Sequence, residues 1–222
     1  QATLTVTDPA GTAAKDSDAS LRATAIAMQR EMPQLTREQV ERLAGQLAED
    51  HVAGVRGAVL ETLRPYARDS AVRAAVAKAF AKNPSVFDDA EFAALVDFLS
   101  PYAGRDEKVR DGLFASLEGL PSATQRAKLL ETVVPKVRID QIVTPLAKLF
   151  AKERDDWMRE ALFKLLKPLS ITKHPELVQA FVAELVEPSS KFRSACATIL
   201  AAAAEIHAEI PPALEDVLLH DQ

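Results

Sequence analysis

The sequence predicts an all-α protein: a right-handed α-solenoid of stacked antiparallel helix pairs, preceded by a short extended segment. Apolar residues recur at helical spacing from residue 18 onward, prolines separate these apolar stripes, and one short pattern containing an arginine recurs along the chain. The 222 residues are 48% hydrophobic and 27% charged, which is typical of a folded globular chain and excludes wholesale disorder. We expect residues 18–222 to form a single domain of about 12 helices.

Residues 1–17 differ from the rest of the chain. Residues 2–7 read Ala-Thr-Leu-Thr-Val-Thr, an alternating and β-branched pattern that predicts a short strand, and residues 8–11 read Asp-Pro-Ala-Gly, which predicts a turn. An isolated extended segment has no local partner for its backbone groups. We therefore expect residues 1–17 to be a leader or the end of a preceding domain.

Apolar stripes then place one helix after another. For example, Val40, Leu43, Ala44 and Leu47 follow the spacing of the buried face of an amphipathic helix. The same reasoning along the chain predicts helices over 18–32, 36–49, 51–67, 70–82, 88–102, 105–119, 122–134, 139–152, 155–167, 175–187, 189–206 and 211–220.

Prolines and capping residues mark the boundaries of these helices. Proline lacks an amide donor and clashes with the preceding turn, so it suits a boundary or a first turn. Thr36 opens a capping-box pattern. Pro65 and Pro101 fall near helix ends and predict kinks or early stops, whereas Pro145 either does the same or opens a fresh helix that splits 139–152.

The recurring pattern is an acidic or hydroxyl residue, two spacers, an apolar residue, an arginine, two more spacers and a second apolar residue. The first residue can cap a helix, and the apolar residues enter the core. The arginine stem can pack at the edge of the buried face while its guanidinium reaches an acidic cap or a carbonyl of the neighbouring unit. The capping and arginine positions of the four clear copies are Asp69 and Arg73, Asp106 and Arg110, Asp155 and Arg159, and Ser189 and Arg193, with a weaker copy around Arg56.

These residues resemble the HEAT and HEAT-like family of helical repeats, in which the second helix opens with an acidic turn followed by an apolar residue and arginine. The resemblance covers residues 36–206 and implies stacked helical repeats, but it says almost nothing about function. Successive arginines of the pattern lie 17, 37, 49 and 34 residues apart. The spacings of 17 and 49 imply an extra helix, or three-helix armadillo-like units, in places, so the pairing of the helices stays open.

No constellation for chemistry emerges from the sequence. The four histidines include no pair four residues apart on one helix and no His-Glu dipeptide, whereas HEAT-like diiron hydroxylases depend on repeated His-Glu pairs. Cys196 is the single cysteine and falls on an apolar stripe, which predicts a small buried hydrophobe. No Gly-rich phosphate loop and no Gly-x-Ser-x-Gly motif occurs. We therefore expect a protein without enzymatic activity, metal or cofactor.

Charge is distributed unevenly along the chain. The net charge of −5 combines −4 over residues 1–125, a zone of +5 over residues 126–173 and −6 over residues 174–222. Trp and Arg are enriched at the hot spots of protein interfaces, so Arg154, Trp157, Arg159 and Lys164 are the predicted partner-binding residues. The alternatives are that these charges only solvate the outer helix faces and that Trp157 packs in the core.

The leading interpretation is a non-catalytic scaffold or adaptor that binds a protein or peptide on the solenoid surface, an acidic one where the basic zone takes part. Two alternatives stay open: a helical-repeat domain of a larger secreted or membrane-associated polypeptide, and a HEAT-like DNA-binding protein or glycosylase or a phycobilin-lyase-like enzyme. Net acidity and few aromatics argue against nucleic acid. The longest uncharged stretch, 194–204, is too short to cross a bilayer. A cytoplasmic location is slightly favoured over a processed secreted or periplasmic one, and the oligomeric state stays open.

Overall fold

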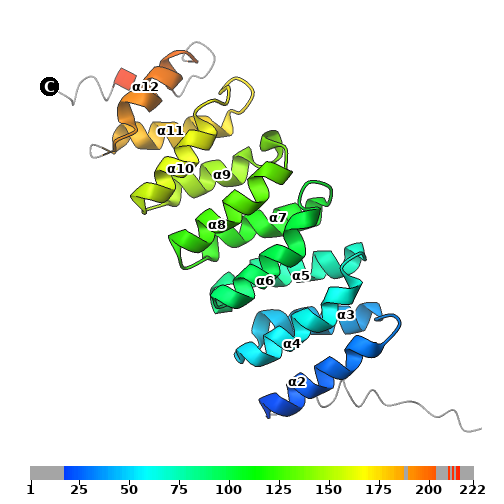
Figure 1. Cartoon of the computed structure of the whole chain (residues 1–222). Coiled ribbons are helices and arrows are strands. Elements are labelled where there is room, and N and C mark those ends of the chain that lie inside the picture. The colour runs from blue at the N-terminus through cyan, green and yellow to red at the C-terminus, as the bar shows by residue number, and fades with distance from the viewer. Residues whose placement is uncertain (1–17, 188–189, 204–209, 211, 213, 216–222) are drawn as a thin grey trace, which may run out of the picture. The chain divides into compact units, whose positions relative to one another are not determined.

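The fold was obtained as a computed structural model, which describes residues 18–187, 190–203, 210, 212 and 214–215. These residues form eleven α-helices and no strand, so the prediction of an all-α protein is confirmed (Figure 1). The predicted leader 1–17, Ser189 and most of the predicted helix 211–220 lie outside the described residues. The chain divides into two compact units, residues 1–137 and 138–222, each of which is described by itself.

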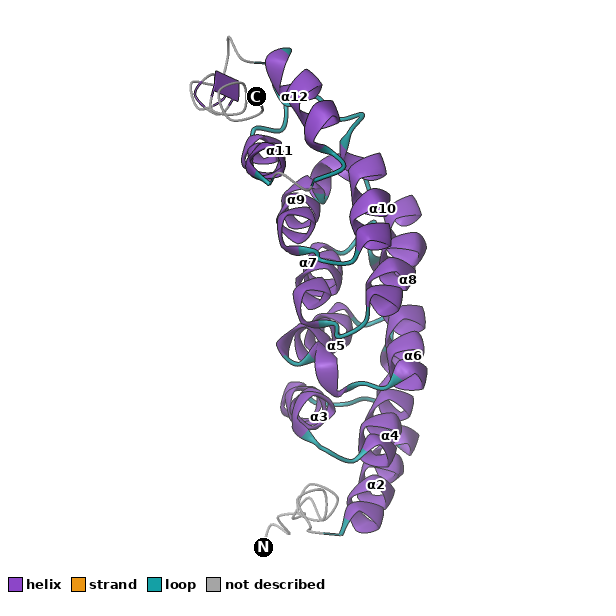
Figure 2. Cartoon of the chain, turned by 90° about the vertical axis from the view of Figure 1, so that its left-hand side faces the viewer, coloured by secondary structure: helices purple, strands orange, loops and turns teal. Residues whose placement is uncertain are grey.

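Helices of the first unit alternate between two rows (Figure 2). One row holds α2 (Ala19–Ala27), α4 (Ala53–Leu63), α6 (Asp89–Leu99) and α8 (Ala123–Val133), and the other holds α3 (Arg37–Glu49), α5 (Ser70–Lys82) and α7 (Glu107–Ser116). Within a row each helix packs against the next, as α5 does against α3 and α7. Neighbours in a row are therefore every second helix of the chain.

The predicted apolar stripes are the buried faces of these helices. In α3, Val40, Leu43, Ala44 and Leu47 are at most 8% exposed, and Phe92 and the other stripe residues of α6 are equally buried. Burying a side chain of the size of Leu or Phe contributes about 1.5–3 kcal/mol. Apolar contacts among the helices therefore supply the main stabilisation of the unit.

Proline ends three helices of one row in the same manner. Single-turn 3-10 helices, Arg64–Tyr66, Ser100–Tyr102 and Val134–Lys136, follow α4, α6 and α8, and each holds a proline at its second residue. The early stops predicted at Pro65 and Pro101 are confirmed. Their cause is that proline cannot donate the next intrahelical hydrogen bond.

The second unit contains the described helices α9 (Val143–Lys152), α10 (Asp156–Leu166), α11 (Glu176–Val186) and α12 (Arg193–Ala201). α9 packs against α10 and α11, and α11 packs against α12. A 3-10 turn, Ile139–Gln141, precedes α9, and Pro145 lies in the first turn of α9, which confirms that the predicted helix 139–152 is split. The core holds four phenylalanine rings with contacting centroids 4.8–6.2 Å apart: Phe150, Phe163, Phe181 and Phe192.

The helix order explains the uneven spacing of the repeated arginines in the first unit. Arg56 and Arg73 lie on consecutive helices, α4 and α5, one in each row, whereas Arg73 and Arg110 lie on α5 and α7 of the same row. The spacing of 17 residues therefore arises because the pattern occurs in both rows. The extra helix or three-helix unit considered from the sequence is absent between α4 and α7.

Candidate protein-binding surface

Arginines of the repeated pattern join neighbouring helices of a row. Arg73 in α5 pairs with Asp106, the residue before α7, with Nη2 2.8 Å from Oδ2. The same guanidinium donates to the carbonyl oxygens of Ala67 and Arg68, and its carbon lies 4.4 Å from the centroid of the Tyr102 ring. The contact expected between the arginine and the acidic residue of a neighbouring helix is confirmed for this copy.

Two further bridges have the same construction. Arg56 in α4 pairs with Glu91 in α6 at 2.7 Å, with side chains only 5% and 12% exposed. Arg22 in α2 pairs with Asp50, just before α4, at 2.9 Å. Arg22 is not among the predicted repeat positions, although Asp18 begins a further copy of the same pattern and caps α2. These buried, charge-assisted contacts make the arginines structural residues.

Two positions of the pattern lack the expected contact within the first unit. Asp106 occupies the N-cap position of α7, but its side chain accepts no capping hydrogen bond from that helix, because its carboxylate faces Arg73 instead. Arg110 is near only Glu107 and Asp111 of its own helix, at 3.9 and 3.7 Å, and its buried Nε has no hydrogen-bond partner in the described part of the chain. The predicted cap at Asp106 is therefore wrong, whereas the bridge expected of Arg110 stays a prediction, because every helix after α8 belongs to the second unit.

Asp69 and Asp155 do cap their helices. The Asp69 carboxylate accepts a hydrogen bond from the backbone N–H of Ala71 at the start of α5, and the Asp155 carboxylate accepts one from the backbone N–H of Met158 at the start of α10. Arg193 donates from Nε to the carbonyl of Leu185, which is the other contact expected of a repeat arginine. The pattern thus fixes the beginnings of these helices.

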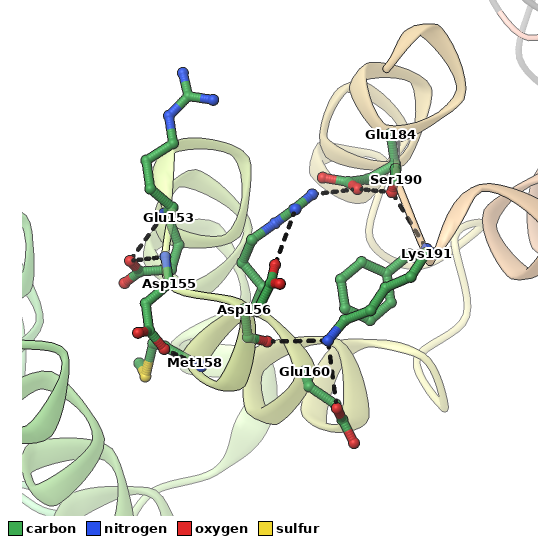
Figure 3. Close-up of polar contacts among 11 residues, drawn as sticks. Glu153, Asp155, Asp156, Met158, Glu160, Glu184, Ser190 and Lys191 are labelled. Carbon is green, nitrogen blue, oxygen red and sulfur yellow. Dashed lines mark hydrogen bonds and ion pairs between the residues drawn. The ribbon is translucent and has the colours of Figure 1, made fainter. Parts of the chain in front are cut away.

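Arg159 of α10 belongs to a polar cluster with Glu184 of α11 and Ser190, which precedes α12; Figure 3 labels these two partner residues. Nη2 of Arg159 lies 2.6 Å from Oε2 of Glu184, and their side chains are 17% and 6% exposed. Ser190 donates a hydrogen bond to the same carboxylate, and the Arg159 guanidinium lies over the Phe192 ring. The structure places this predicted binding residue in an internal ion pair, apart from the exposed side chains of the other three.

Trp157 lies on the surface. Its side chain is 57% exposed, although Met158, Leu162 and Leu166 of the same helix are fully buried. The alternative that Trp157 packs in the core is therefore wrong. None of the other exposed large hydrophobic residues of the described chain is aromatic: Leu21, Met28, Met32 and Val186.

Cations flank this indole along the chain. Arg154 precedes it in the loop before α10, is exposed, and has no side-chain ion pair in the described structure. Lys164 follows Trp157 by seven residues, which is two helical turns on the same face or about 10 Å. We refer to Arg154, Trp157 and Lys164 as the Trp157 surface.

Two nearby carboxylates, those of Glu153 and Glu160, already have hydrogen-bond or ion-pair partners. Glu160 lies 2.9 Å from Nζ of Lys164 and 3.5 Å from Nζ of Lys191, and the hydrogen bond from Lys164, with a further contribution from Lys191, lowers the pKa of Glu160 (Figure 3). Glu153 accepts hydrogen bonds from the backbone N–H groups of Arg154 and Asp155. The surface therefore presents an exposed indole and two exposed cations, with Glu153 and Glu160 engaged and Asp156 80% exposed beside the indole.

Catalytic and metal chemistry have no comparable constellation in the described residues. Cys196 is buried, and its burial raises the pKa of the thiol to about 12, with the charge of Glu184 acting in the same direction and Arg159 opposing it. No three His, Cys, Asp or Glu side chains among these residues are placed to hold a metal ion. None of the described helices combines the length and the apolar character required to cross a membrane.

Comparisons with protein-family models, with curated proteins and with solved structures gave no match. A function for the chain must therefore be inferred from its own geometry.

Proposed function

We propose that the chain is an α-solenoid of HEAT-like repeats that acts as a non-catalytic scaffold or adaptor and holds a protein or peptide on the Trp157 surface. One observation carries this proposal: a tryptophan that is 57% exposed on a helix whose inward face is fully buried without it. Burying an aromatic side chain of this size contributes more to an interface than almost any other residue. No contact among the described residues of the second unit explains why the position holds tryptophan.

The solenoid part of the proposal is supported by the two rows of the first unit and by their repeated Arg–carboxylate bridges. Each bridge links a helix to the next helix of its row, as Arg56 does with Glu91. Repeats that contact only their neighbours are the defining property of solenoids, and such proteins commonly bind partners over extended surfaces.

The distribution of charge supports a protein partner over a nucleic acid. Arg159 pairs with Glu184, and Lys164 pairs with Glu160, so carboxylates accompany two of the cations predicted for the site. Affinity for a phosphate backbone grows with the number of phosphates that cations neutralise, and this surface offers only Arg154 and Lys164.

Affinity capture from the native host tests the proposal. The full chain, a Trp157→Ala variant and a Met28→Ala control would be used as baits. Met28 is 68% exposed in the first unit, so its removal deletes an exposed apolar side chain elsewhere. We expect the chain and the Met28→Ala control to retain a specific protein that the Trp157→Ala variant loses. Capture of nothing above background, or equal capture by all three baits, would contradict the proposal.

A further inference from the structure

Resting on the proposed function, we infer that the Trp157 surface takes an acidic peptide segment whose central apolar side chain covers the indole and whose carboxylates lie on both sides. The partner is thus a polypeptide of stated pattern: acidic, apolar, acidic. This pattern follows from the two exposed cations that precede and follow the indole in the sequence, Arg154 and Lys164.

The geometry sets the arrangement of the partner. Arg154 and Lys164 lie on opposite sides of Trp157 along the chain, and Lys164 is about 10 Å away along the α10 axis at 1.5 Å per residue. An extended peptide rises about 3.3 Å per residue, so a carboxylate about three residues from the apolar anchor reaches Lys164. Arg154, which precedes Trp157 in the loop before α10, is the cation available to the segment on the other side of the anchor.

The cations are available to a partner. Arg154 is exposed without an ion pair among the described residues. Lys164 is 73% exposed and pairs with Glu160, an exposed contact four residues away on the same helix. Exposed pairs of this kind contribute little to stability, and Lys191 also contacts Glu160, so Lys164 can turn to an incoming carboxylate at small cost.

Two exposed carboxylates limit where the acids of the partner can lie: Asp156 next to the indole and Glu160 three residues after it, with side chains 80% and 47% exposed. Asp156 has only a 4.0 Å contact with Arg159. It adjoins Trp157, so it repels an acidic residue placed directly over the start of α10. An apolar residue at that point, with acids displaced toward Arg154 and Lys164, avoids the repulsion. Asp156 therefore favours the same order of residues that the cations favour.

Selection from a phage-displayed library of random peptides tests the inference, with the full chain as bait. We expect the enriched peptides to carry Asp or Glu on both sides of one apolar residue. Synthetic copies of these peptides should bind at least about tenfold more weakly to the Trp157→Ala variant than to the unchanged chain, which is the loss expected when a hot-spot side chain is removed. Arg154→Glu and Lys164→Glu should weaken binding as well, whereas Lys78→Glu in α5, an exposed lysine of the first unit, should not. Unchanged unfolding curves would show that each variant is folded.

The outcomes separate this inference from the proposed function. Enriched peptides that need Trp157 but are neutral or basic around the apolar residue overturn the acidic pattern and leave the scaffold proposal standing. Binding that Arg154→Glu and Lys164→Glu leave unchanged likewise overturns the acidic pattern and leaves the scaffold proposal standing. Peptides that bind equally well without Trp157, or the absence of any enriched peptide, overturn the inference itself, and host capture then decides the scaffold proposal separately.

Discussion

Replacing Gly112 by alanine should destabilise the first unit, although alanine is the better helix former. Gly112 lies in α7, where that helix crosses α5 closely. A Cβ atom at Gly112 would lie 2.7 Å from Cβ, 2.8 Å from the carbonyl oxygen and 2.9 Å from the carbonyl carbon of Ala77. Carbon atoms in contact prefer about 3.5–4.0 Å. Two of the three atoms belong to the backbone, so no side-chain rotation relieves the overlap and the helices must separate.

The expected magnitude is the difference between two terms. Alanine is favoured over glycine within a helix by about 0.8–1.0 kcal/mol. An extra carbon atom in a well-packed interior costs about 1–3 kcal/mol. Because the clash with Ala77 involves the backbone, the cost lies in the upper part of that range, and we expect Gly112→Ala to lower the free energy of unfolding by about 1–2 kcal/mol.

Gly45→Ala in α3 is the matched control, because a Cβ atom there meets nothing within 4 Å. This variant should gain about 0.5–1 kcal/mol from helix propensity alone. Urea unfolding followed by far-ultraviolet circular dichroism measures both variants against the unchanged chain. If Gly112→Ala proves as stabilising as Gly45→Ala, the close crossing of α5 and α7 is refuted.

Three further changes test the remaining contacts. Arg56→Ala leaves the buried Glu91 carboxylate unpaired and should cost about 3–5 kcal/mol in urea unfolding, whereas Arg37→Ala, which removes an exposed pair, should change stability by less than about 0.5 kcal/mol. Cys196 should react with a thiol reagent at pH 8 only after unfolding. Because burial raises the pKa of this thiol to about 12 in the folded chain, the unfolded chain loses the proton first, so the free energy of unfolding should fall as the pH rises above about 9. Cys196→Ala should remove that part of the fall. Trp157→Ala should leave the free energy of unfolding within about 0.5 kcal/mol while abolishing host capture, since the side chain is exposed; a large loss of stability would show instead that the indole is structural.

The positions of the helices could be predicted because each boundary has a local cause. Pro65 and Pro101 stop their helices through their missing amide donors, and Thr36 opens α3 with a capping box that the structure contains. The two rows could not be predicted in the same way. Every helix has the same periodicity, and only contacts between helices distant in sequence decide which ones become neighbours.

Bridging contacts were only partly predictable for the same reason. The arginine of the pattern is local, but its acceptor is not. Arg56 pairs with Glu91 in the first turn of α6, and Arg73 pairs with Asp106 at an N-cap. Arg159 pairs with Glu184 of α11. The acid is therefore chosen by the packing of the helices, and the sequence could indicate only that an acid or a carbonyl would be used.

The repeated pattern of the sequence does indicate that Trp157 is exposed. Trp157 is the second spacer between the capping Asp155 and the apolar Met158. With the copy that begins at Asp18 included, the residues at this spacer position are exposed in all five clear copies: Ser20, Ala71, Lys108, Trp157 and Lys191. Aligning the copies would have placed the indole on the surface, whereas composition alone left the question open.

The same alignment shows where such a chain can acquire a binding site. The cap, the apolar residues and the arginine are fixed by helix initiation, by the core and by the bridges between helices, so changing them destabilises the fold. The second spacer faces solvent and takes no part in capping, in the core or in the arginine bridges, since small, hydroxyl and charged residues all occupy it. At one position only, among the described copies, it holds a large aromatic side chain, and there cations precede and follow it in the sequence. Arg159 joins α10 to α11 from within the same copy that presents Trp157 to solvent. A single repeat thus separates the residue that maintains the structure from the residue proposed to bind the partner, which is why we expect the fold to survive the removal of Trp157.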